Sequence, residues 1–210
     1  MGELWQKIRR ADNGVLWICE KFAQIVLVSV LWLLACLPVI TILPATAALY
    51  YACVKSIRRE WDSPWKAFLK SFRENCGQGV CLSLAVLLPV GACLYAIVGG
   101  ASGFAGALAR VLLVWVLVWS AWLAMGLSRF SRSFASQLKF AWSAMVASVP
   151  RSGGVLLVSL GVICAEILYW PLVLMLPGLW ALVTSVLAEP VLVRYMPADN
   201  RPDWYWGAKS

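Results

Sequence analysis

Long uncharged stretches alternate with short charged blocks along this chain, and one uncharged stretch near the start covers residues 22–54. Its thirty-three residues (FAQIVLVSVLWLLACLPVITILPATAALYYACV) include two prolines, Pro38 and Pro44. About 20 apolar residues already cross a bilayer, so this stretch is too long for one ordinary membrane helix. We therefore predict two crossings that are joined by a turn or an unwound joint at residues 38–44.

The whole pattern predicts six membrane-crossing helices, at residues 15–37, 45–57, 76–98, 111–127, 154–170 and 179–193. We expect an all-α fold, a polytopic helical membrane protein with a single integral membrane domain over residues 1–210. The uncharged part of the second segment is short, which leaves a five-crossing alternative open. Lys55 at its end can extend its alkyl chain along the helix and reach the interface.

The composition also indicates a membrane location. Hydrophobic residues make up 62% and charged residues 13% of the chain, whereas a soluble domain carries about 25% charged residues. A water-soluble core of this length could not bury so much apolar surface, so lipid is the expected solvent. The net charge of +8 does not indicate nucleic acid, because the cations lie beside apolar segments and no recognition motif accompanies them.

The Lys and Arg residues favour one orientation in the membrane. With six crossings and both termini in the cytoplasm, seventeen of the eighteen cations lie inside and only Arg110 lies outside. With five crossings and an external N-terminus, thirteen lie inside and five outside. Cytoplasmic loops carry an excess of Lys and Arg. We therefore expect a cell-membrane protein with six crossings and two cytoplasmic termini.

Two charged blocks predict amphipathic surface helices at residues 63–74 and 134–149. The first begins with Ser63 and Pro64, which are favoured at a helix start. Apolar residues then recur at helical spacing, with cations on the opposite face, as in a helix that lies on a membrane surface. A solvent-facing helix on a soluble partner is the alternative. The candidate membrane-surface residues are Trp65, Lys66, Phe68, Lys70, Phe72, Arg73 and Asn75.

The two blocks are laid out alike. Fourteen positions separate Trp65 from Gly79, and fourteen separate Phe140 from Gly154. Gly-Val opens a membrane helix each time, which suggests two related halves, each with a crossing, a surface helix and another crossing.

Two carboxylates, Glu166 and Glu189, lie well inside apolar segments. A charge at mid-bilayer costs roughly several kcal/mol, so an intramembrane acid is a candidate functional residue. Glu189 lies five residues before Arg194, so a structural position near the inner interface is its alternative. We expect Glu166 to be protonated, or paired with a polar group such as Thr184 or Ser185 on the neighbouring helix.

Thr41 and Thr46 flank the proline joint, where their hydroxyls can bond to backbone groups that the prolines leave unpaired. Broken helices form ion and substrate sites in transporters. Such a break is more often a simple turn, and we favour the turn here.

Common catalytic and metal-binding patterns do not occur in the sequence. It has no histidine, no CxxC pair among its seven cysteines, no P-loop and no G-x-S-x-G motif. We therefore predict no enzyme activity, no cofactor, no metal site and no disulfide.

The run LPVITILPATAALYYACVKSIRRE, followed by FLKSFRENCGQG, resembles the YesL-like family of bacterial integral membrane proteins. In that family a proline-bearing turn leads into a Pro-Ala-Thr-Ala-Ala-Leu-Tyr segment, and a Phe-x-x-(Ser)-Phe-x-x-Asn segment follows. The matching positions here are Pro44, Ala45, Thr46, Ala47, Ala48, Leu49 and Tyr50, then Phe68, Ser71, Phe72 and Asn75. The resemblance covers about the first eighty residues, and Leu43 stands where the family has a glycine.

The resemblance implies a role without giving a mechanism. The family has no established activity, and its members are often encoded near carbohydrate-uptake ABC transporters and polysaccharide-degrading enzymes. It implies a non-catalytic accessory or assembly partner of such a transporter, with the lipid bilayer and permease subunits as partners. A small secondary transporter that uses the broken helix and Glu166 is the alternative. The family-motif turn comprises Pro38, Thr41, Pro44, Thr46, Tyr50 and Tyr51.

Overall fold

The computed structural model describes the backbone of residues 2–58, 62–100, 102–130 and 132–195, and side chains from Trp17 onward within these ranges. Every regular element in these ranges is helical, so the predicted all-α class is confirmed. The elements are α1 (Gly2–Ala35), η1 (Val39–Thr41), α2 (Ile42–Ala52), η2 (Cys53–Arg58), α3 (Pro64–Val98), α4 (Gly103–Leu127), α5 (Phe134–Ala147), α6 (Val149–Leu168), η3 (Trp170–Leu174) and α7 (Leu176–Arg194).

Six described segments are long and apolar enough to cross a membrane, and each overlaps one predicted crossing. They are Trp17–Ala35, Val39–Arg58, Pro64–Val98, Gly103–Leu127, Val149–Leu168 and Leu176–Arg194. A polytopic membrane protein is the class that these helices define. Residues 196–210 lie outside the described residues.

The joint at residues 38–44 is a tight turn, and the second crossing is longer than predicted. The short helix η1 makes the turn, and α2 begins before Pro44 rather than after it. Proline is tolerated in the first turn of a helix, where backbone N–H groups have no helical partner. At the other end the π-helix η2 continues α2 to Arg58. The segment Val39–Arg58 therefore has 20 residues.

The predicted surface helix at 63–74 and the predicted crossing at 76–98 are one helix. α3 runs without a break over 35 residues, a length of about 50 Å. The prediction of a separate surface helix is therefore wrong for this block. The polar residues between the two predicted elements are interpreted as a boundary in the sequence, but a helix accepts such residues as readily as a loop does.

The second block does divide into two helices, as predicted, with small shifts in their bounds. α5 ends at Ala147 and α6 begins at Val149, so the fifth crossing starts five residues earlier than expected. Ser148 between them has φ −132° and ψ 51°, which interrupts the helical path.

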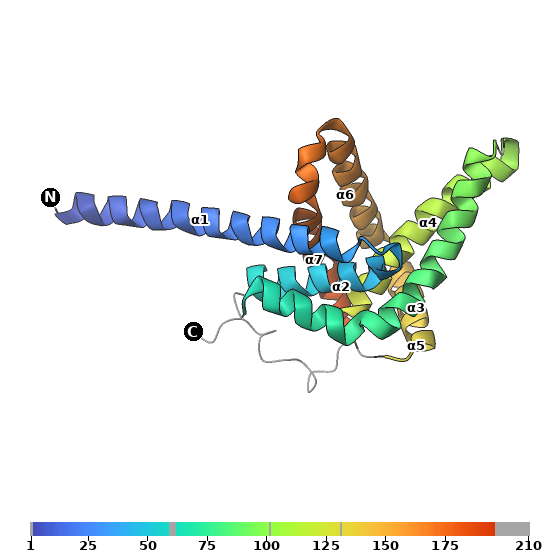
Figure 1. Ribbon diagram of the computed structural model, residues 1–210, viewed down its shortest axis with the longest axis horizontal. Coiled ribbons are helices and arrows are strands. Elements are labelled where there is room, and N and C mark those ends of the chain that lie inside the picture. The colour runs from blue at the N-terminus through green and yellow to red at the C-terminus, as the bar shows by residue number, and fades with distance from the viewer. Residues whose placement is uncertain (1, 59–61, 101, 131, 196–210) are drawn as a thin grey trace.

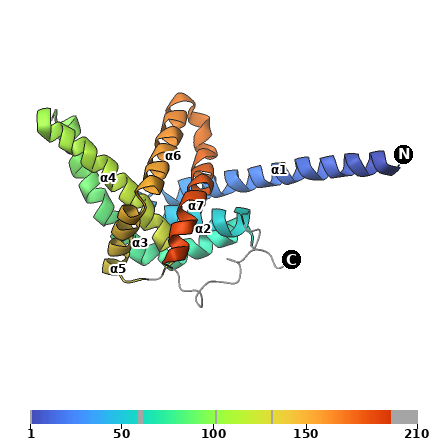
Figure 2. The same ribbon diagram turned by 180° about the vertical axis from the view of Figure 1, so that it is seen from behind.

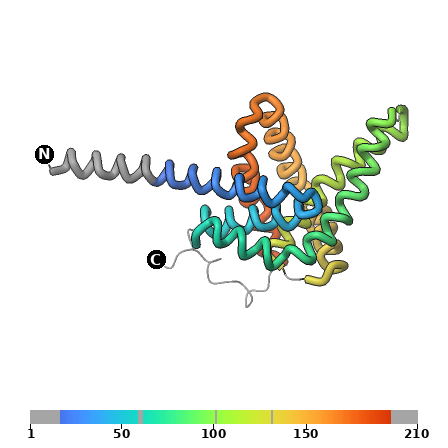
Figure 3. The backbone as a smooth tube through the Cα atoms, in the orientation of Figure 1, coloured from blue at the N-terminus to red at the C-terminus, as the bar shows by residue number. Residues whose placement is uncertain are grey.

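The helices form a packed base from which two hairpins diverge (Figure 1). α3 and α4 make one hairpin, and α6 and α7 make the other, as the view from behind also shows (Figure 2). α2 lies in the base, beside the part of α1 that follows Trp17 (Figure 3). Two buried clusters meet at α2: one joins it to α3, α4, α5 and α7, and the other joins it to α1, η2 and α3. α2 is therefore the central helix.

Candidate functional site

An ion pair lies inside the helical base. Arg129 lies two positions after the end of α4, and its Nη2 lies 2.6 Å from Oε1 of Glu189 on α7; 2% and 7% of the two side chains are exposed. Tyr50 of α2 donates its hydroxyl to the same oxygen at 3.3 Å. The Tyr50 ring centroid lies 5.7 Å from the guanidinium carbon of Arg129. The pair thus ties together three helices.

Burial makes this pair costly to break. Taking two charges out of water costs free energy, and their attraction offsets that cost only while both are present. Removing one partner of a buried pair costs about 3–5 kcal/mol. The described structure thus gives Glu189 an internal partner, Arg129. The two residues are sixty positions apart, so no local pattern could pair them.

Glu166 occupies a different place and does not form one site with Glu189. It lies two positions before the end of α6, close to the hairpin turn, and is half-buried. Glu189 follows Leu176, the first residue of α7, by thirteen positions, about 20 Å along the helix axis. The predicted partners of Glu166, Thr184 and Ser185, instead donate to carbonyl oxygens of α7.

A groove of about 390 Å³ lies between the two hairpins, with residues from α2 in its wall. Its lining is mostly apolar, and its polar residues include Thr46, Ser120, Ser159 and Glu166. Ser120 and Ser159 each donate their hydroxyl to a carbonyl of their own helix. Trp180 donates its indole N–H to Ser159 at 2.9 Å. Glu166 is therefore the carboxylate in an otherwise nearly neutral groove.

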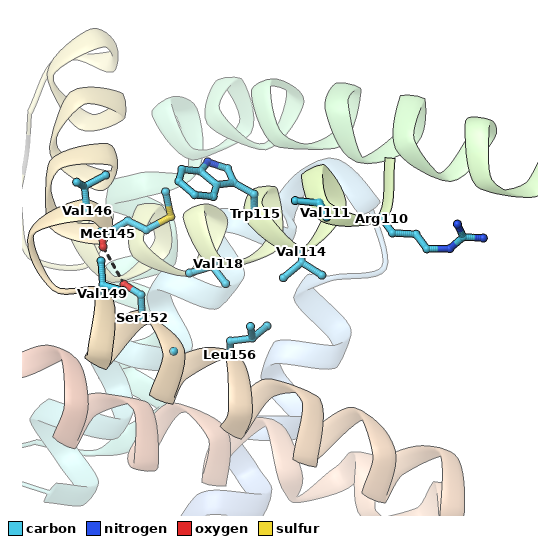
Figure 4. A pocket seen from close by; sticks show the side chains of 11 residues that line it. Arg110, Val111, Val114, Trp115, Val118, Met145, Val146, Val149, Ser152 and Leu156 are labelled. Atoms are coloured by element: carbon cyan, nitrogen blue, oxygen red, sulfur yellow. Dashed lines mark hydrogen bonds between the residues drawn. The ribbon is translucent and has the colours of Figure 1, made fainter. Parts of the chain in front are cut away.

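A second groove, of about 580 Å³, lies between α4 on one side and α5 and α6 on the other (Figure 4). Its walls are apolar, with Trp115 of α4 facing Met145 of α5, and Arg110 stands at one end. Ser152 donates to the Met145 carbonyl at 3.1 Å and accepts from Trp122 at 3.0 Å. The Ser152 hydroxyl is thus bonded within the protein, and the mostly apolar groove suits an apolar group.

The predicted turn residues have separate contacts rather than one shared site. The Thr41 hydroxyl lies within hydrogen-bond distance of the Ala35 and Pro38 carbonyls, as expected of a threonine beside a proline turn. Thr46 donates to the Ile42 carbonyl at 2.7 Å and accepts from Trp32 of α1 at 3.2 Å. Both hydroxyls therefore stabilise the α1–α2 hairpin.

The two remaining motif residues of this region contact other elements. Pro44 faces Gly79 of α3 so closely that a Cβ on Gly79 would lie 2.6 Å from the Pro44 Cβ. The Tyr51 ring centroid lies 5.6 Å from Nζ of Lys55. The family-motif turn is therefore a packing centre in which several helices meet.

The candidate membrane-surface residues lie on two sides of α3. Phe68 is 1% exposed and packs in the cluster shared by α1, α2 and η2, with its ring stacked on Phe72 at 6.2 Å. Asn75 donates to the Ser71 carbonyl at 2.9 Å. The side chains of Trp65, Lys66, Lys70 and Arg73 are exposed. The apolar face predicted to lie on lipid is thus partly buried in protein, and lipid contact by the exposed residues stays a prediction.

Metal-ligand clusters are absent from the described residues, since no three His, Cys, Asp or Glu side chains gather in them. All seven cysteines are free thiols. Outside the crossings, Asp62 accepts from the Ser63 N–H at 2.8 Å and from Lys55 at 3.2 Å. The Ser63 N–H, helped by Lys55, holds the pKa of Asp62 below its usual range, so this carboxylate is charged at neutral pH.

The helix content and the six apolar spans define a polytopic α-helical membrane protein. Residues 25–97 match the family described as "Protein of unknown function, DUF624". This match covers about a third of the chain and includes the turn, α2 and all but the last residue of α3. No curated protein and no solved structure matches the chain.

Proposed function

We propose that this chain is a non-catalytic accessory or assembly subunit of a membrane transporter, in the cell membrane with both termini in the cytoplasm. The observation that carries the proposal is the large helical surface that other parts of this chain leave uncovered. Within the most apolar 18 residues of α6, 11% are buried, whereas 72% are buried in the corresponding stretch of Val39–Arg58. A helix face of this kind contacts lipid or a second membrane protein, and we propose the second.

The diverging hairpins favour a protein neighbour over lipid alone. The 390 Å³ groove between them is lined by helices on both sides, and membrane helices associate through close packing rather than through apolarity itself. A helix of a second membrane protein fits such a groove better than disordered acyl chains do. The groove and the exposed face of α6 together form the proposed docking surface.

The kind of transporter is proposed from the resemblance. The two runs that resemble the YesL-like family, residues 37–60 and 68–79, lie within the matched residues 25–97, and we propose membership of that family. Its association with carbohydrate-uptake ABC transporters supports a permease subunit as the neighbour. A non-catalytic role fits the sequence, which lacks histidine.

A second candidate is a small secondary transporter, favoured by the position of Glu166 in the groove between the hairpins. An intramembrane acid in a cavity can carry a coupling proton. We rank it second because the turn at residues 38–44 ties α1 to α2 rather than opening into this groove as an unwound helix.

A cross-linking experiment tests the docking surface. A photoreactive amino acid replaces Leu157, which is 71% exposed on α6. Leu88 of α3 is 73% exposed and lines neither groove, so it supplies the matched control position. In cells grown on a carbohydrate, we expect the 157 variant to cross-link a polytopic permease subunit and the 88 variant to give no such adduct. Adducts with lipid alone at 157 would contradict the proposal.

Reconstitution of the purified chain separates the two candidates. An accessory subunit alone gives no sugar or proton flux, and Glu166→Gln changes nothing. A proton-coupled sugar flux that Glu166→Gln abolishes would promote the transporter, because an amide cannot cycle a proton.

A further inference from the structure

A polar pocket lies apart from both grooves, where α1, η2 and the start of α3 meet. It has a volume of about 360 Å³, and Glu20, Gln24, Ser56 and Asp62 line it together with Trp17. Its walls are mostly polar, unlike those of either groove. Neither the turn, nor the ion pair, nor the docking surface involves this pocket.

Two buried polar atoms of residues that line this pocket, Oγ of Ser56 and Oε1 of Gln24, have no hydrogen-bond partner among the described residues. Ser56 as a whole is 3% exposed. The amide of Gln24 is oriented by Glu20, whose Oε1 accepts from Nε2 at 3.0 Å. A flipped amide would turn its oxygen toward the carboxylate, so Oε1 faces away from Glu20. Leaving such a group unsatisfied costs about 1–3 kcal/mol, which indicates a ligand that donates hydrogen bonds.

The charges in the pocket select the kind of donor. Glu20 and Asp62 supply two carboxylates, and Gln24 Oε1 and Ser56 Oγ supply further acceptors. A primary ammonium group carries three N–H donors and a positive charge, so it matches this set. A quaternary ammonium has the charge without the donors.

The pocket also contains a cation and an aromatic side chain. Nζ of Lys21 lies 3.0 Å from the Ile57 carbonyl and 5.6 Å from the Trp17 ring centroid. Its positive charge on the pocket wall favours an anionic group beside the ammonium. Trp17 is 54% exposed, and an indole at this position suits the headgroup level of a bilayer.

The pocket stands where headgroups would be. The charge-free stretch of α1 begins at Phe22, directly after Lys21. We propose that this pocket binds the headgroup of an aminophospholipid, with its primary ammonium on Glu20, Gln24, Ser56 and Asp62 and its phosphate toward Lys21. The acyl chains of such a lipid run beside the apolar part of α1.

Lipid titration of the full chain in detergent tests the assignment. Phosphatidylethanolamine, phosphatidylcholine and phosphatidylglycerol with matched acyl chains are compared by native mass spectrometry and by thermal unfolding. One hydrogen bond to a charged group is worth about tenfold or more in affinity. We expect phosphatidylethanolamine to bind about tenfold or more tightly than phosphatidylglycerol, with phosphatidylcholine between them.

Two variants connect the preference to the pocket. Ser56→Ala removes the buried hydroxyl without adding volume, so it weakens phosphatidylethanolamine binding while it stabilises the lipid-free protein. Glu20→Gln removes a charge at an exposed position and lowers the preference in the same way. Glu74→Gln, an exposed carboxylate that pairs with Lys70 at 4.0 Å, is the matched control and leaves the preference unchanged.

Three results would overturn the proposal. One is equal binding of the three lipids, which means that the pocket holds only water. Another is a preference for phosphatidylethanolamine that persists in both Ser56→Ala and Glu20→Gln. The third is displacement by free phosphoethanolamine at the same concentration as the lipid, which would assign the pocket to a soluble amine. The outcome does not depend on whether α6 docks to a transporter.

Discussion

The two charged blocks lead into membrane crossings in the same order, yet their backbones take different paths. Residues 64–98 form the single helix α3, whereas residues 134–168 form α5 and α6 with Ser148 between them. Both blocks place an aromatic residue fourteen positions before a glycine, Trp65 before Gly79 and Phe140 before Gly154. Equal spacing therefore does not give equal structure.

The two blocks differ in where a proline stands relative to the junction with the crossing. Pro64 stands at the first position of α3, where its missing N–H is harmless. Pro150 stands sixteen positions into the second block, where a continuing helix would need its N–H. The carbonyls freed there accept from side chains instead, since Ser148 donates to Ala144 and Ser152 donates to Met145. A proline alone does not divide a helix, since Pro89 lies inside the unbroken α3. At the second junction Pro150 stands beside the non-helical backbone of Ser148, and the block and its crossing are two helices there.

The largest expected effect on stability comes from comparing the ion pairs of Arg129 and Lys55, the cations near the start of the two blocks. Arg129 pairs with Glu189 inside the base, whereas Lys55 pairs with Asp62, whose side chain is 36% exposed. Arg129→Ala is expected to lower the free energy of unfolding by about 3–5 kcal/mol, because it leaves Glu189 buried without this partner. Unfolding of the detergent-solubilised protein in sodium dodecyl sulfate measures it.

The double variant Arg129→Met with Glu189→Leu is the control for this pair. Apolar side chains of similar volume often replace a buried ion pair at little cost. The double variant is therefore expected to recover most of the lost stability. A loss in Arg129→Ala below about 1 kcal/mol, the range of exposed pairs, would remove the contrast between the two blocks.

A smaller effect is expected at the two equivalent glycines. A Cβ on Gly79 would lie 2.6 Å from Cβ of Pro44, a rigid ring, whereas a Cβ on Gly154 would lie 3.1 Å from the flexible end of Leu187. Gly79→Ala is expected to cost about 1–3 kcal/mol through overpacking. Gly154→Ala is expected to be neutral or stabilising by up to about 1 kcal/mol through helix propensity.

Thermal unfolding of the two alanine variants in the same detergent compares these positions directly. Each variant serves as the control for the other, because both add one methyl group to a membrane helix. Equal changes in melting temperature would mean that the close approach of Pro44 to α3 has no energetic weight.

The smallest expected effect concerns Asp62. Asp62→Asn is expected to cost at most about 1 kcal/mol, as for exposed ion pairs. Because the folded-state pKa of Asp62 is lowered, its contribution is present above the unfolded pKa of about 3.9. It is lost as the pH falls through the folded-state pKa. Unfolding at pH 7 and at progressively lower pH, with Glu74→Gln as the exposed-carboxylate control, measures it.

Hydrophobic pattern predicts the fold class and all six apolar segments of this chain, because segment length and apolarity are local properties. It does not predict that α3 is continuous, since local polarity does not separate a loop from a polar helical turn. Nor does it predict where α2 begins, because Pro44 reads equally well as the end of a joint or as the first turn of a helix.

The contacts that the sequence could not predict at the candidate sites join residues that are far apart in the chain. Glu189 is recognisable in the sequence as an acid in an apolar segment, but its partner Arg129 lies in another segment. Glu166 and Glu189 are both acids in apolar segments, but they lie at opposite ends of the α6–α7 hairpin. Glu166 is near the turn and Glu189 is near the base. The pocket with Ser56 and Gln24 could not be predicted, because whether a serine or glutamine lacks a hydrogen-bond partner depends on its surroundings in the fold.

The central position of α2 has a consequence for biosynthesis. α2 belongs to the segment Val39–Arg58, which has the lowest mean hydropathy of the six apolar segments, 1.4, and the largest buried share. When this segment leaves the translocon, it is therefore poorly suited to contact with lipid. The hydrogen bond from Tyr50 to Glu189 can form only after another 139 residues have been synthesised. At about 5–20 residues per second, roughly 7–30 s of synthesis pass before α7 arrives. During that interval α1 and α3 shield α2, and a chain that terminates before α7 presents an unfinished core to quality-control proteases.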